Sequence, residues 1–373
     1  MKLEVQIKQK AREIGFDLVG ITSTERFEEE YQRLKERKAE NTLSPFLNDD
    51  IELLTTPKKH MKSARSIIAL ALSYAVDDIS DNNYNISIYA QGKDYHRVME
   101  TKMNKLSDYL ENIKEGVKTL SYVDTGPLLD RAIAHRAGLG WIGKNNNLIN
   151  PKYGSFLFIG EIITNLELNS DTPMLNQCGE CRLCLDSCPS GALEQEKYIN
   201  SKRCIGYLTQ KKSFIPEKER KMIGQNLWGC DICQMVCPHN QDIPQDIHRE
   251  FKPHLDANLE SILNFSKKKY PDNWKYSALS WRGVRILKRN ALIIIGNKKL
   301  KEFLPKVHQK IEANSPIIRG YAVWAAGEIG DVSSVRLIKK QYKKEKNNKV
   351  IYEMQRSFDK NKNWGVLDDK NQN

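Results

Sequence analysis

The sequence of 373 residues has no long apolar run: segments such as residues 291–295 fall far short of the about 18–20 apolar residues that a membrane-spanning helix needs. The first eight residues alternate charged and apolar side chains and lack the continuous apolar core of a secretory signal. We therefore expect a cytoplasmic protein without a membrane segment. With 40% apolar and 28% charged residues, the composition excludes a disordered or collagen-like chain and predicts two or three folded domains.

Two nucleotide-binding signatures are also missing. The sequence contains no glycine fingerprint of a dinucleotide-binding fold and no phosphate-binding lysine loop, so neither a nicotinamide cofactor nor a nucleoside triphosphate is indicated. Cysteine is absent from most of the chain, because all eight cysteines lie between Cys178 and Cys237. In a reducing compartment this crowding indicates one metal-binding module rather than disulfides.

The spacing of these cysteines is that of a bacterial ferredoxin. Cys178, Cys181, Cys184 and Cys188-Pro189 form one such run, and Cys230, Cys233 and Cys237-Pro238 form a second run that lacks one cysteine, which Cys204 can supply. The spacing predicts two 4Fe-4S clusters, one on Cys178, Cys181, Cys184 and Cys237 and the other on Cys188, Cys204, Cys230 and Cys233. The alternative is two tetrahedral zinc sites, which use separated Cys-x-x-Cys pairs and need no third cysteine two residues on. Two clusters form an electron relay, so an electron acceptor is expected elsewhere in the chain.

The net charge of +12 is concentrated at one end. The basic excess lies entirely in residues 281–373, whereas the charges of residues 1–280 cancel. A basic region of this kind is typical of a protein that binds a polyanion such as a nucleic acid. The alternative is a solubilising surface.

The apolar pattern divides the chain into three parts. Residues 1–165 alternate between helices (7–14, 96–113 and 127–137) and strands (17–21, 67–74, 120–123 and 156–163), which predicts an α/β sandwich with a polar, ligand-holding loop at 143–147. Residues 166–250 hold the cysteines. Residues 251–373 read as helical, and residues 289–296 recur as residues 319–327, which predicts a short HEAT-like array; the tail after residue 343 is expected to fray. The fold class is α+β multidomain.

Several segments resemble the epoxyqueuosine reductases. They are residues 92–96 (Gly-Lys-Asp-Tyr-His), 123–132, 136–145, 207–210 and 229–231, which together with the cysteine runs and the C-terminal repeat cover the chain in order. The resemblance implies a cobalamin-dependent iron-sulfur enzyme that reduces epoxyqueuosine to queuosine at the wobble position of tRNA. It also implies a nitroreductase-like α/β unit that binds cobalamin base-off without a protein histidine ligand, next to a ferredoxin-like double 4Fe-4S module. Reductive dehalogenases use similar cofactors but usually carry a twin-arginine signal, which this N-terminus lacks.

The resemblance also assigns site residues. Asp124 matches the family's proton donor, and a donor beside an opening epoxide stabilises the charge that develops on oxygen; the alternative is that Asp124 caps the following helix. The contacts to cobalamin implied by the resemblance are Ser87, Tyr95, His96, Asp124, Arg131, Lys144, Asn145, Leu148, Gln210, Ser213 and Asp231. Tyr95 and His96 could instead anchor the helix that begins there. The family's arginine just before Thr56-Pro57 is absent, since residues 53–55 are Leu-Leu-Thr.

The partners follow from the same resemblance and from the charge. We expect tRNA carrying epoxyqueuosine to be held by Arg285, Lys288, Arg289 and Arg319; alternatively, Arg289 and Arg319 tie helices together through carbonyl groups. A reduced ferredoxin or flavodoxin-type protein is the expected electron donor, and the chain is expected to be a monomer. A different class of function is a non-catalytic electron-transfer or corrinoid-reactivating protein, which would have no need of the basic C-terminal region.

Overall fold

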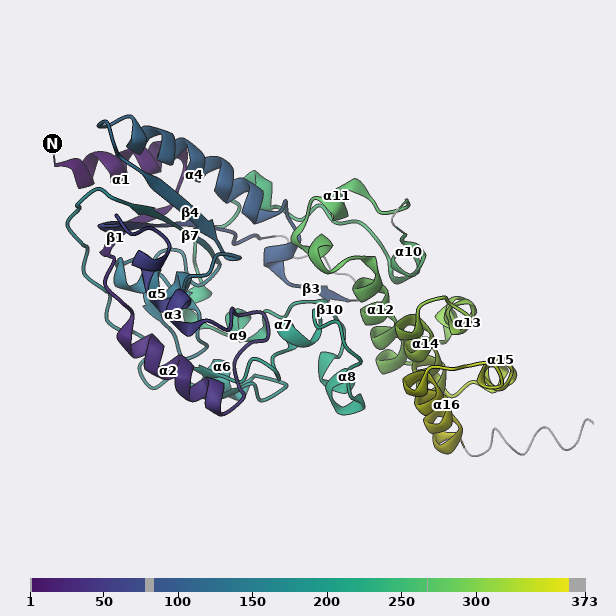
Figure 1. Cartoon of the computed structure of the whole chain (residues 1–373). Helices are drawn as coiled ribbons and strands as arrows, with labels where there is room; N and C mark the ends of the chain where they lie inside the picture. The colour runs from purple at the N-terminus through teal and green to yellow at the C-terminus, as the bar shows by residue number, and fades with distance from the viewer. Residues whose placement is uncertain (1, 78–83, 267, 362–373) are drawn as a thin grey trace, which may run out of the picture. The chain divides into compact units, whose positions relative to one another are not determined.

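The computed structural model describes residues 2–77, 84–266 and 268–361 (Figure 1). The chain forms two compact units, of which unit 1 comprises Met1–Ile79, Ile88–Cys204 and Asp231–His254, and unit 2 comprises Ser80–Ser87, Ile205–Cys230 and Leu255–Asn373. Among the described residues, no helix has the length and apolar character required to cross a bilayer. The predicted division at residues 165 and 250 differs from these units because cysteine-bearing segments belong to both, and the three-domain division stays a prediction.

Unit 1 is built on a four-stranded antiparallel sheet in the order β1-β2-β7-β4. The strands are β1 (Leu18–Ser23), β2 (Ser66–Ser73), β7 (Leu157–Thr164) and β4 (Thr119–Val123). Every residue of β2 is buried, as its continuous apolar run predicts for a strand covered on both faces. All four strands predicted from the sequence are confirmed.

Helices cover both faces of this sheet. On one face α4 (Tyr95–Glu111) packs on β4 and β7, and α1 (Leu3–Ile14) packs on α4 and β1. Gly160 in β7 permits the close approach of α4, because a Cβ atom there would lie 2.8 Å from Met103 Sδ. On the other face α5 (Asp130–Arg136) packs on β2 and β7 through the apolar cluster that contains Ile133 and Ala134. The helices α2 (Glu28–Ala39) and α3 (Ile51–Thr55) pack against each other.

The cysteine-bearing part of unit 1 consists of short elements. Two helices of one turn, α6 (Leu183–Asp186) and α9 (Ile232–Met235), pack together, although about fifty residues separate them in the sequence. The remaining elements are two hairpins, β5 (Trp141–Ile142) with β6 (Leu148–Ile149) and β8 (Leu193–Gln195) with β9 (Tyr198–Ile199). Elements this short have few backbone hydrogen bonds of their own, so their arrangement depends on tertiary contacts.

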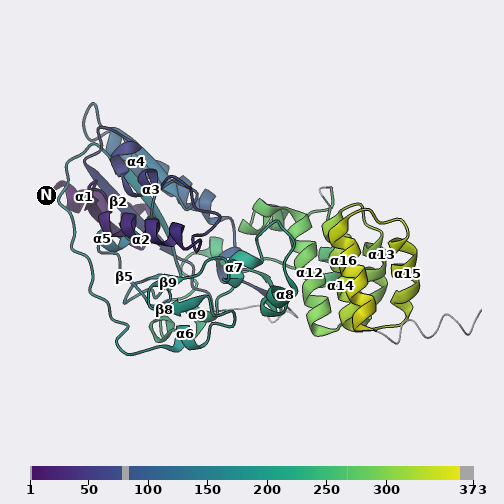
Figure 2. The same ribbon diagram turned by 60° about the horizontal axis from the view of Figure 1, so that its bottom comes forward.

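Unit 2 is mainly helical (Figure 2). Its elements are β3 (Asn85–Ile86), α7 (Ile205–Leu208), α8 (Glu217–Ile223), β10 (Asn226–Trp228), α10 (Leu259–Asn264), α11 (Asp272–Lys275), α12 (Val284–Lys298), α13 (Leu304–Ile311), α14 (Pro316–Ile329), α15 (Ser333–Tyr342) and α16 (Asn348–Lys360). The short strands β3 and β10 pair in parallel, a pairing that the sequence pattern did not predict.

The repeated sequence of unit 2 forms α12 and α14, which pack on each other, and α14 also packs on α13 and α16. A glycine in each repeat allows close contact: a Cβ atom at Gly296 would lie 2.5 Å from the Trp324 ring, and one at Gly327 would lie 2.5 Å from Ser357 Oγ. The expectation of a frayed tail after residue 343 is wrong as far as residue 360. Asn347 caps α16, and the apolar face of this helix buries Val350.

Candidate functional site

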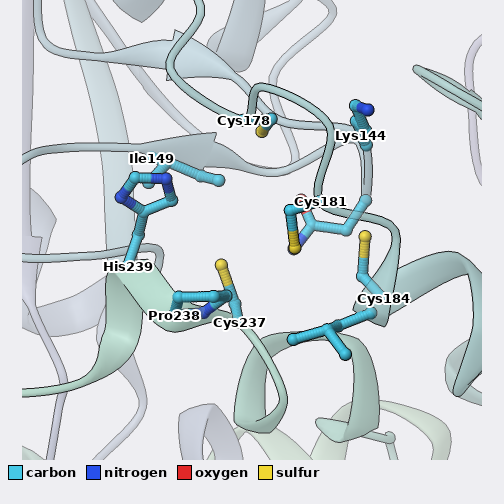
Figure 3. Close-up of a pocket in the computed structure, with 10 residues that line it drawn as sticks. Lys144, Ile149, Cys178, Cys181, Cys184, Cys237, Pro238 and His239 are labelled. Atoms are coloured by element: carbon cyan, nitrogen blue, oxygen red, sulfur yellow. The ribbon is translucent and has the colours of Figure 1, made fainter.

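Four cysteines of unit 1 surround one cavity (Figure 3). Cys178, Cys181 and Cys184 come from the first ferredoxin run, and Cys237 comes from the end of the second. The contact between α6 and α9 brings these distant segments together. The structure therefore gathers the four thiols that the sequence assigned to the first cluster, and the remaining wall includes Ile149, Leu183, Pro238 and His239.

The cysteine spacing is what distinguishes iron-sulfur clusters from zinc sites here. Among residues 2–77, 84–266 and 268–361, no group of three or more His, Cys, Asp or Glu side chains is placed to hold a metal ion. All eight cysteines are free. Burial, and then the charges of Cys237 and Cys178, raise the pKa of the Cys184 thiol, so thiolates at this cavity require positive charge for stability. The iron ions of a cluster supply that charge.

Two residues expected to contact cobalamin lie in the wall of this cavity. The ammonium group of Lys144 is 2.7 Å from Glu196 and its side chain is 8% exposed. Asn145 is buried, and its amide donates to the carbonyl oxygen of Cys233 at 3.3 Å. The polar loop at 143–147 is thus part of the support of the cysteine segment.

The second predicted group of cysteines is divided between the units, since Cys230 belongs to unit 2 and the others to unit 1. Cys188 nevertheless has the surroundings of a cluster ligand. Burial raises the pKa of its thiol, but backbone N–H groups, that of Leu193 first, and the Ser190 hydroxyl outweigh burial and hold the pKa below its usual value. Such donors to sulfur stabilise a thiolate ligand. The grouping of these four cysteines stays a prediction.

A second cluster of polar residues lies where β4 ends. Asp124 follows β4 directly, and its side chain is 59% exposed. The Tyr95 hydroxyl donates to Asp124 Oδ2 at 2.7 Å, and His96 Nε2 lies 3.6 Å from the same oxygen. On the other side of the imidazole, Nδ1 lies 2.8 Å from Asp94 Oδ1. The ring of Tyr95 is stacked on Phe158 of β7 with centroids 4.2 Å apart, which fixes the direction of its hydroxyl.

These contacts decide where the proton resides at neutral pH. Burial lowers the pKa of His96, but its interactions with Asp124 and Asp94 outweigh burial and raise the pKa to about 9. Although the Asp124 side chain is 59% exposed, the protein around its carboxyl group partly shields it from water and raises its pKa; the interactions with His96 and Tyr95 outweigh this effect and hold the pKa below its ordinary value. Near pH 7 the imidazole is therefore protonated and the Asp124 carboxylate is ionised. The pair therefore holds one proton, which is on the imidazole of His96, between the exposed carboxylate of Asp124 and the carboxylate of Asp94.

The alternative role of Asp124 as a helix cap is wrong. The helix α5 begins at Asp130, later than predicted, and its N-cap residue is Leu129, which makes no side-chain cap bond. Asp124 itself has a positive φ of 49°, in the left-handed region that Asp and Asn tolerate better than most residues. Asp94, in contrast, does cap α4, since it accepts the backbone N–H of His96 at 3.1 Å.

The other expected contacts to cobalamin differ in exposure. In unit 1, Arg131 is exposed and donates to the carbonyl oxygen of Asn146, whereas Asp231 accepts the Ile88 N–H at 2.8 Å. Leu148 is buried in the apolar cluster beneath α5, and its contact with cobalamin stays a prediction.

The remaining three expected contacts belong to unit 2. The Ser87 N–H donates to Trp228, Gln210 accepts from the indole N–H of Trp281 at 3.1 Å, and Ser213 is exposed. Ser87 and Gln210 are buried. Ser213 is therefore the one of the three whose side chain is open to solvent.

The four residues expected to bind tRNA do not form one exposed row. Arg285 is exposed and Lys288 is partly buried, but Arg289 is 0% exposed and donates to the carbonyl oxygens of Leu208, Thr209 and Lys211. This corrects the expectation for Arg289, because a guanidinium bound to buried carbonyl groups cannot meet a phosphate.

Arg319 is likewise committed within unit 2. Its guanidinium forms two bonds with Glu345, of 2.6 and 2.8 Å, and donates to the carbonyl oxygens of Ala313 and Asn314. These bonds hold the start of α14 against the segment that follows α15. The structural alternative therefore describes both arginines.

Sequence reasoning overlooked two acidic residues near Asp124. Glu161 lies within β7 at 0% exposure, and Asp130 is the first residue of α5. The signal was present, since Glu161 interrupts an otherwise apolar run. Sequence reasoning also overlooked Lys310 on α13. The pKa of Lys288 is lowered mainly by burial and, to a smaller extent, by the positive charge of Lys310.

The sequence of the cysteine-bearing segment is similar to that of known iron-sulfur proteins. Residues 177–240 match a family model described as a 4Fe-4S double cluster binding domain. With the four-thiol cavity and the α/β sheet, this match defines the class of the protein as an iron-sulfur oxidoreductase. Residues 55–125 match a second model, described as epoxyqueuosine reductase QueG.

Full-length relatives identify the family. Epoxyqueuosine reductases of Bacillus anthracis and Bacillus subtilis are 37% and 36% identical over 369 residues; the alignments cover 95% and 96% of this chain, and 97% and 96% of the relatives. A crystal structure of an epoxyqueuosine reductase with an epoxyqueuosine-modified tRNA-Tyr stem loop is 36% identical, with a TM-score of 0.93, covering 96% of this chain and 99% of that one. The chain belongs to the epoxyqueuosine reductase family.

Proposed function

We propose that this protein reduces epoxyqueuosine to queuosine at the wobble position of tRNA, the last step of queuosine biosynthesis. The observation that carries the proposal is the exposed Asp124 carboxylate held by Tyr95 and protonated His96 in the same unit as the four-thiol cavity. The solved relative with a modified tRNA stem loop supports the substrate, and a Bacillus subtilis relative whose catalytic aspartate loop is swung out of the active site supports an aspartate in the chemistry. A non-catalytic electron carrier has no use for such a donor.

We propose cobalamin as the electron-accepting cofactor, bound base-off as the family resemblance implies. The residues of unit 1 fit a corrin, whose rim carries many amide groups, because Asp124 and Arg131 are exposed and retain hydrogen-bonding capacity. When bound, cobalamin would supply a reduced cobalt centre for the epoxide, with its electrons supplied one at a time by the two 4Fe-4S clusters. We propose a nitroreductase-like relationship for the sheet and helices that would hold it.

The chain's own residues would supply the proton chemistry. Removal of the epoxide oxygen consumes two electrons and two protons and leaves an alkene and water, so each turnover needs two protonation steps at oxygen. The first proton comes from the His96–Asp124 pair, since Asp124 is the member of the pair exposed toward a ligand. His96 then supports the transfer, because its second nitrogen is anchored on Asp94 and keeps the ring in position.

For tRNA we propose the HEAT-like helices α12 and α13 as the phosphate-binding surface, with Arg285, Lys288 and Lys310 in place of Arg289 and Arg319. The pKa of Lys310 is lowered by burial and then by the charge of Lys306. The pKa of Lys288 is lowered by burial and then by the charge of Lys310. Cations that repel one another in the free protein gain most when a polyanion arrives. Such contacts position phosphates, and recognition of the modified base falls to the site around Asp124.

The test uses protein with reconstituted clusters and added cobalamin, a low-potential reductant and an epoxyqueuosine-modified stem loop, all without oxygen. Nucleoside mass analysis should show loss of one oxygen atom from the modified base, and no loss with Asp124→Asn or without cobalamin. Intact epoxyqueuosine in the complete wild-type reaction would contradict the proposal. Titration with ferredoxin and flavodoxin, and sedimentation of the free protein, test the proposed electron donor and the monomeric state.

A further inference from the structure

Glu161 has an unusual position for a carboxyl group. It lies on β7, opposite Ala69 of β2 and Tyr122 of β4, on the face that α5 covers. It is 0% exposed, and among the described residues neither of its oxygens has a hydrogen-bond partner within normal distance. Burying a carboxyl group without donors is expensive, and an apolar residue would pack well in this cluster.

A second carboxyl group, that of Asp130, begins the helix α5 that packs on β7, and it is close enough for its charge to act on Glu161. One oxygen of Asp130 is also buried without a conventional partner, although the residue as a whole is partly exposed at the start of α5. Two facing carboxyl groups in a buried site cannot both ionise, so they share protons. This pair is therefore a store of protons beneath the loop that carries Asp124.

Among the described residues, the titratable groups that act on the pair are Asp124 in the loop before α5, Arg131 on α5 and the Tyr122 phenol on β4. The facing position of β2 is Ala69, which carries no titratable group. Burial, and then Asp130 and Asp124, raise the pKa of Glu161 well above its usual value. Burial and the Asp124 charge raise the pKa of Asp130 to about 7, against the smaller opposing effect of Arg131.

We propose that Glu161 and Asp130 hold the second proton of epoxide reduction, and that Asp130 passes it to Asp124 between the two protonation steps. The inference rests on the proposed function, in which the His96–Asp124 pair holds one proton and the reaction consumes two. After the His96–Asp124 pair has given the first proton, through Asp124, to the epoxide oxygen, Asp130 donates its proton to Asp124 and takes another from Glu161. The second proton leaves with the oxygen as water, and the two electrons come from the clusters. Glu161 and Asp130 act through Asp124 and do not touch the substrate.

Infrared spectroscopy tests the store without any turnover. The wild-type protein near pH 7 should show the carbonyl stretch of a buried protonated carboxylic acid, shifted in heavy water, and Glu161→Gln should lose it. The matched control is Glu167→Gln, because Glu167 lies just beyond β7 with a side chain that is 83% exposed. Absence of the band in the wild type, or its persistence in Glu161→Gln, would overturn the proposal whether or not the protein reduces epoxyqueuosine.

Single-turnover rates test the relay. Asp130→Asn should slow reduction by at least about tenfold, at the low end of what a proton donor contributes. It should also remove the decline in rate that we expect of the wild type as pH rises through about 7, where Asp130 loses its proton. Melting temperature and iron content should match those of Glu167→Gln, since an amide has nearly the same shape as the carboxyl group that it replaces. A wild-type rate and pH profile in Asp130→Asn would mean that the pair only anchors α5. If Glu161→Gln does not fold, the infrared test is made on Asp130→Asn, which should shift the same band.

Discussion

Replacing the buried Arg289 by alanine should destabilise unit 2 strongly. Its guanidinium donates to the carbonyl oxygens of Leu208, Thr209 and Lys211, and of these Thr209 keeps a second donor in the Asn290 amide. Two buried carbonyl groups thus lose the donor that the structure gives them, at about 1–3 kcal/mol each. With the cavity left by the side chain, we expect a loss of roughly 3–5 kcal/mol. For a unit of this size that corresponds to a melting temperature lower by roughly 10 °C.

The assay is thermal unfolding of the full chain without oxygen, followed by far-ultraviolet circular dichroism, because unit 2 supplies much of the helix signal. Arg285→Ala is the matched control, since Arg285 lies one turn earlier on α12 and is exposed. It should melt like the wild type but bind the tRNA stem loop more weakly, with a reduced salt dependence. The stability of Arg289→Lys should lie between that of the wild type and that of Arg289→Ala, because one ammonium group cannot reach all three carbonyl oxygens. An unchanged melting temperature in Arg289→Ala, with weaker binding of tRNA, would refute this reasoning and restore Arg289 to the tRNA-binding surface.

Four further outcomes are expected. Asp124→Asn should retain cobalamin binding, measured by absorption, but lose at least about 100-fold in single-turnover rate; a wild-type rate would exclude it as the donor. Because the raised pKa of His96 keeps the imidazole protonated up to about pH 9, the reduction rate of Asp130→Asn should fall only above that pH. Adding His96→Gln to this variant should abolish the fall in rate above pH 9. Cys204→Ser should reduce the iron content from about eight to about four per chain, whereas zinc in place of iron would contradict the cluster assignment. Lys288→Glu with Lys310→Glu should weaken stem-loop binding and lower its salt slope without lowering the melting temperature, and equal affinity at all salt concentrations would place the tRNA elsewhere.

The sequence was most informative where a local pattern determines the structure. The strand β2 is a continuous apolar run, β7 is apolar apart from Glu161 and its last residue, and the spacing of Cys178, Cys181 and Cys184 follows from the geometry of a cube. The pairing of these three with Cys237 was also predictable, because the two ferredoxin runs have complementary halves. The four-thiol cavity in unit 1 agrees with that expectation.

The role of Arg289 could not be predicted, because it depends on carbonyl groups about eighty residues away. On the sequence, an arginine in a basic segment resembles a phosphate ligand, and only the approach of residues 208–211 to α12 shows that it is buried. The start of α5 and the short strands β3 and β10 are likewise set by tertiary contacts. Glu161 needed both the register of β7 and the position of Asp130 before its isolation from donors could be recognised.

The placement of Cys237 beside Cys184 also makes iron a covalent cross-link within the fold. The chain leaves unit 1 after Cys204 and returns to it at Asp231, and a cluster bound at the cavity would join residues on both sides of that excursion. Closing a loop of some fifty residues removes conformational freedom from the unfolded chain worth roughly 4 kcal/mol, by analogy with a disulfide. The cluster would therefore act on stability as well as on electron transfer. In a cell short of iron, both the activity and the amount of this protein would fall, because the apo form unfolds more easily and is degraded.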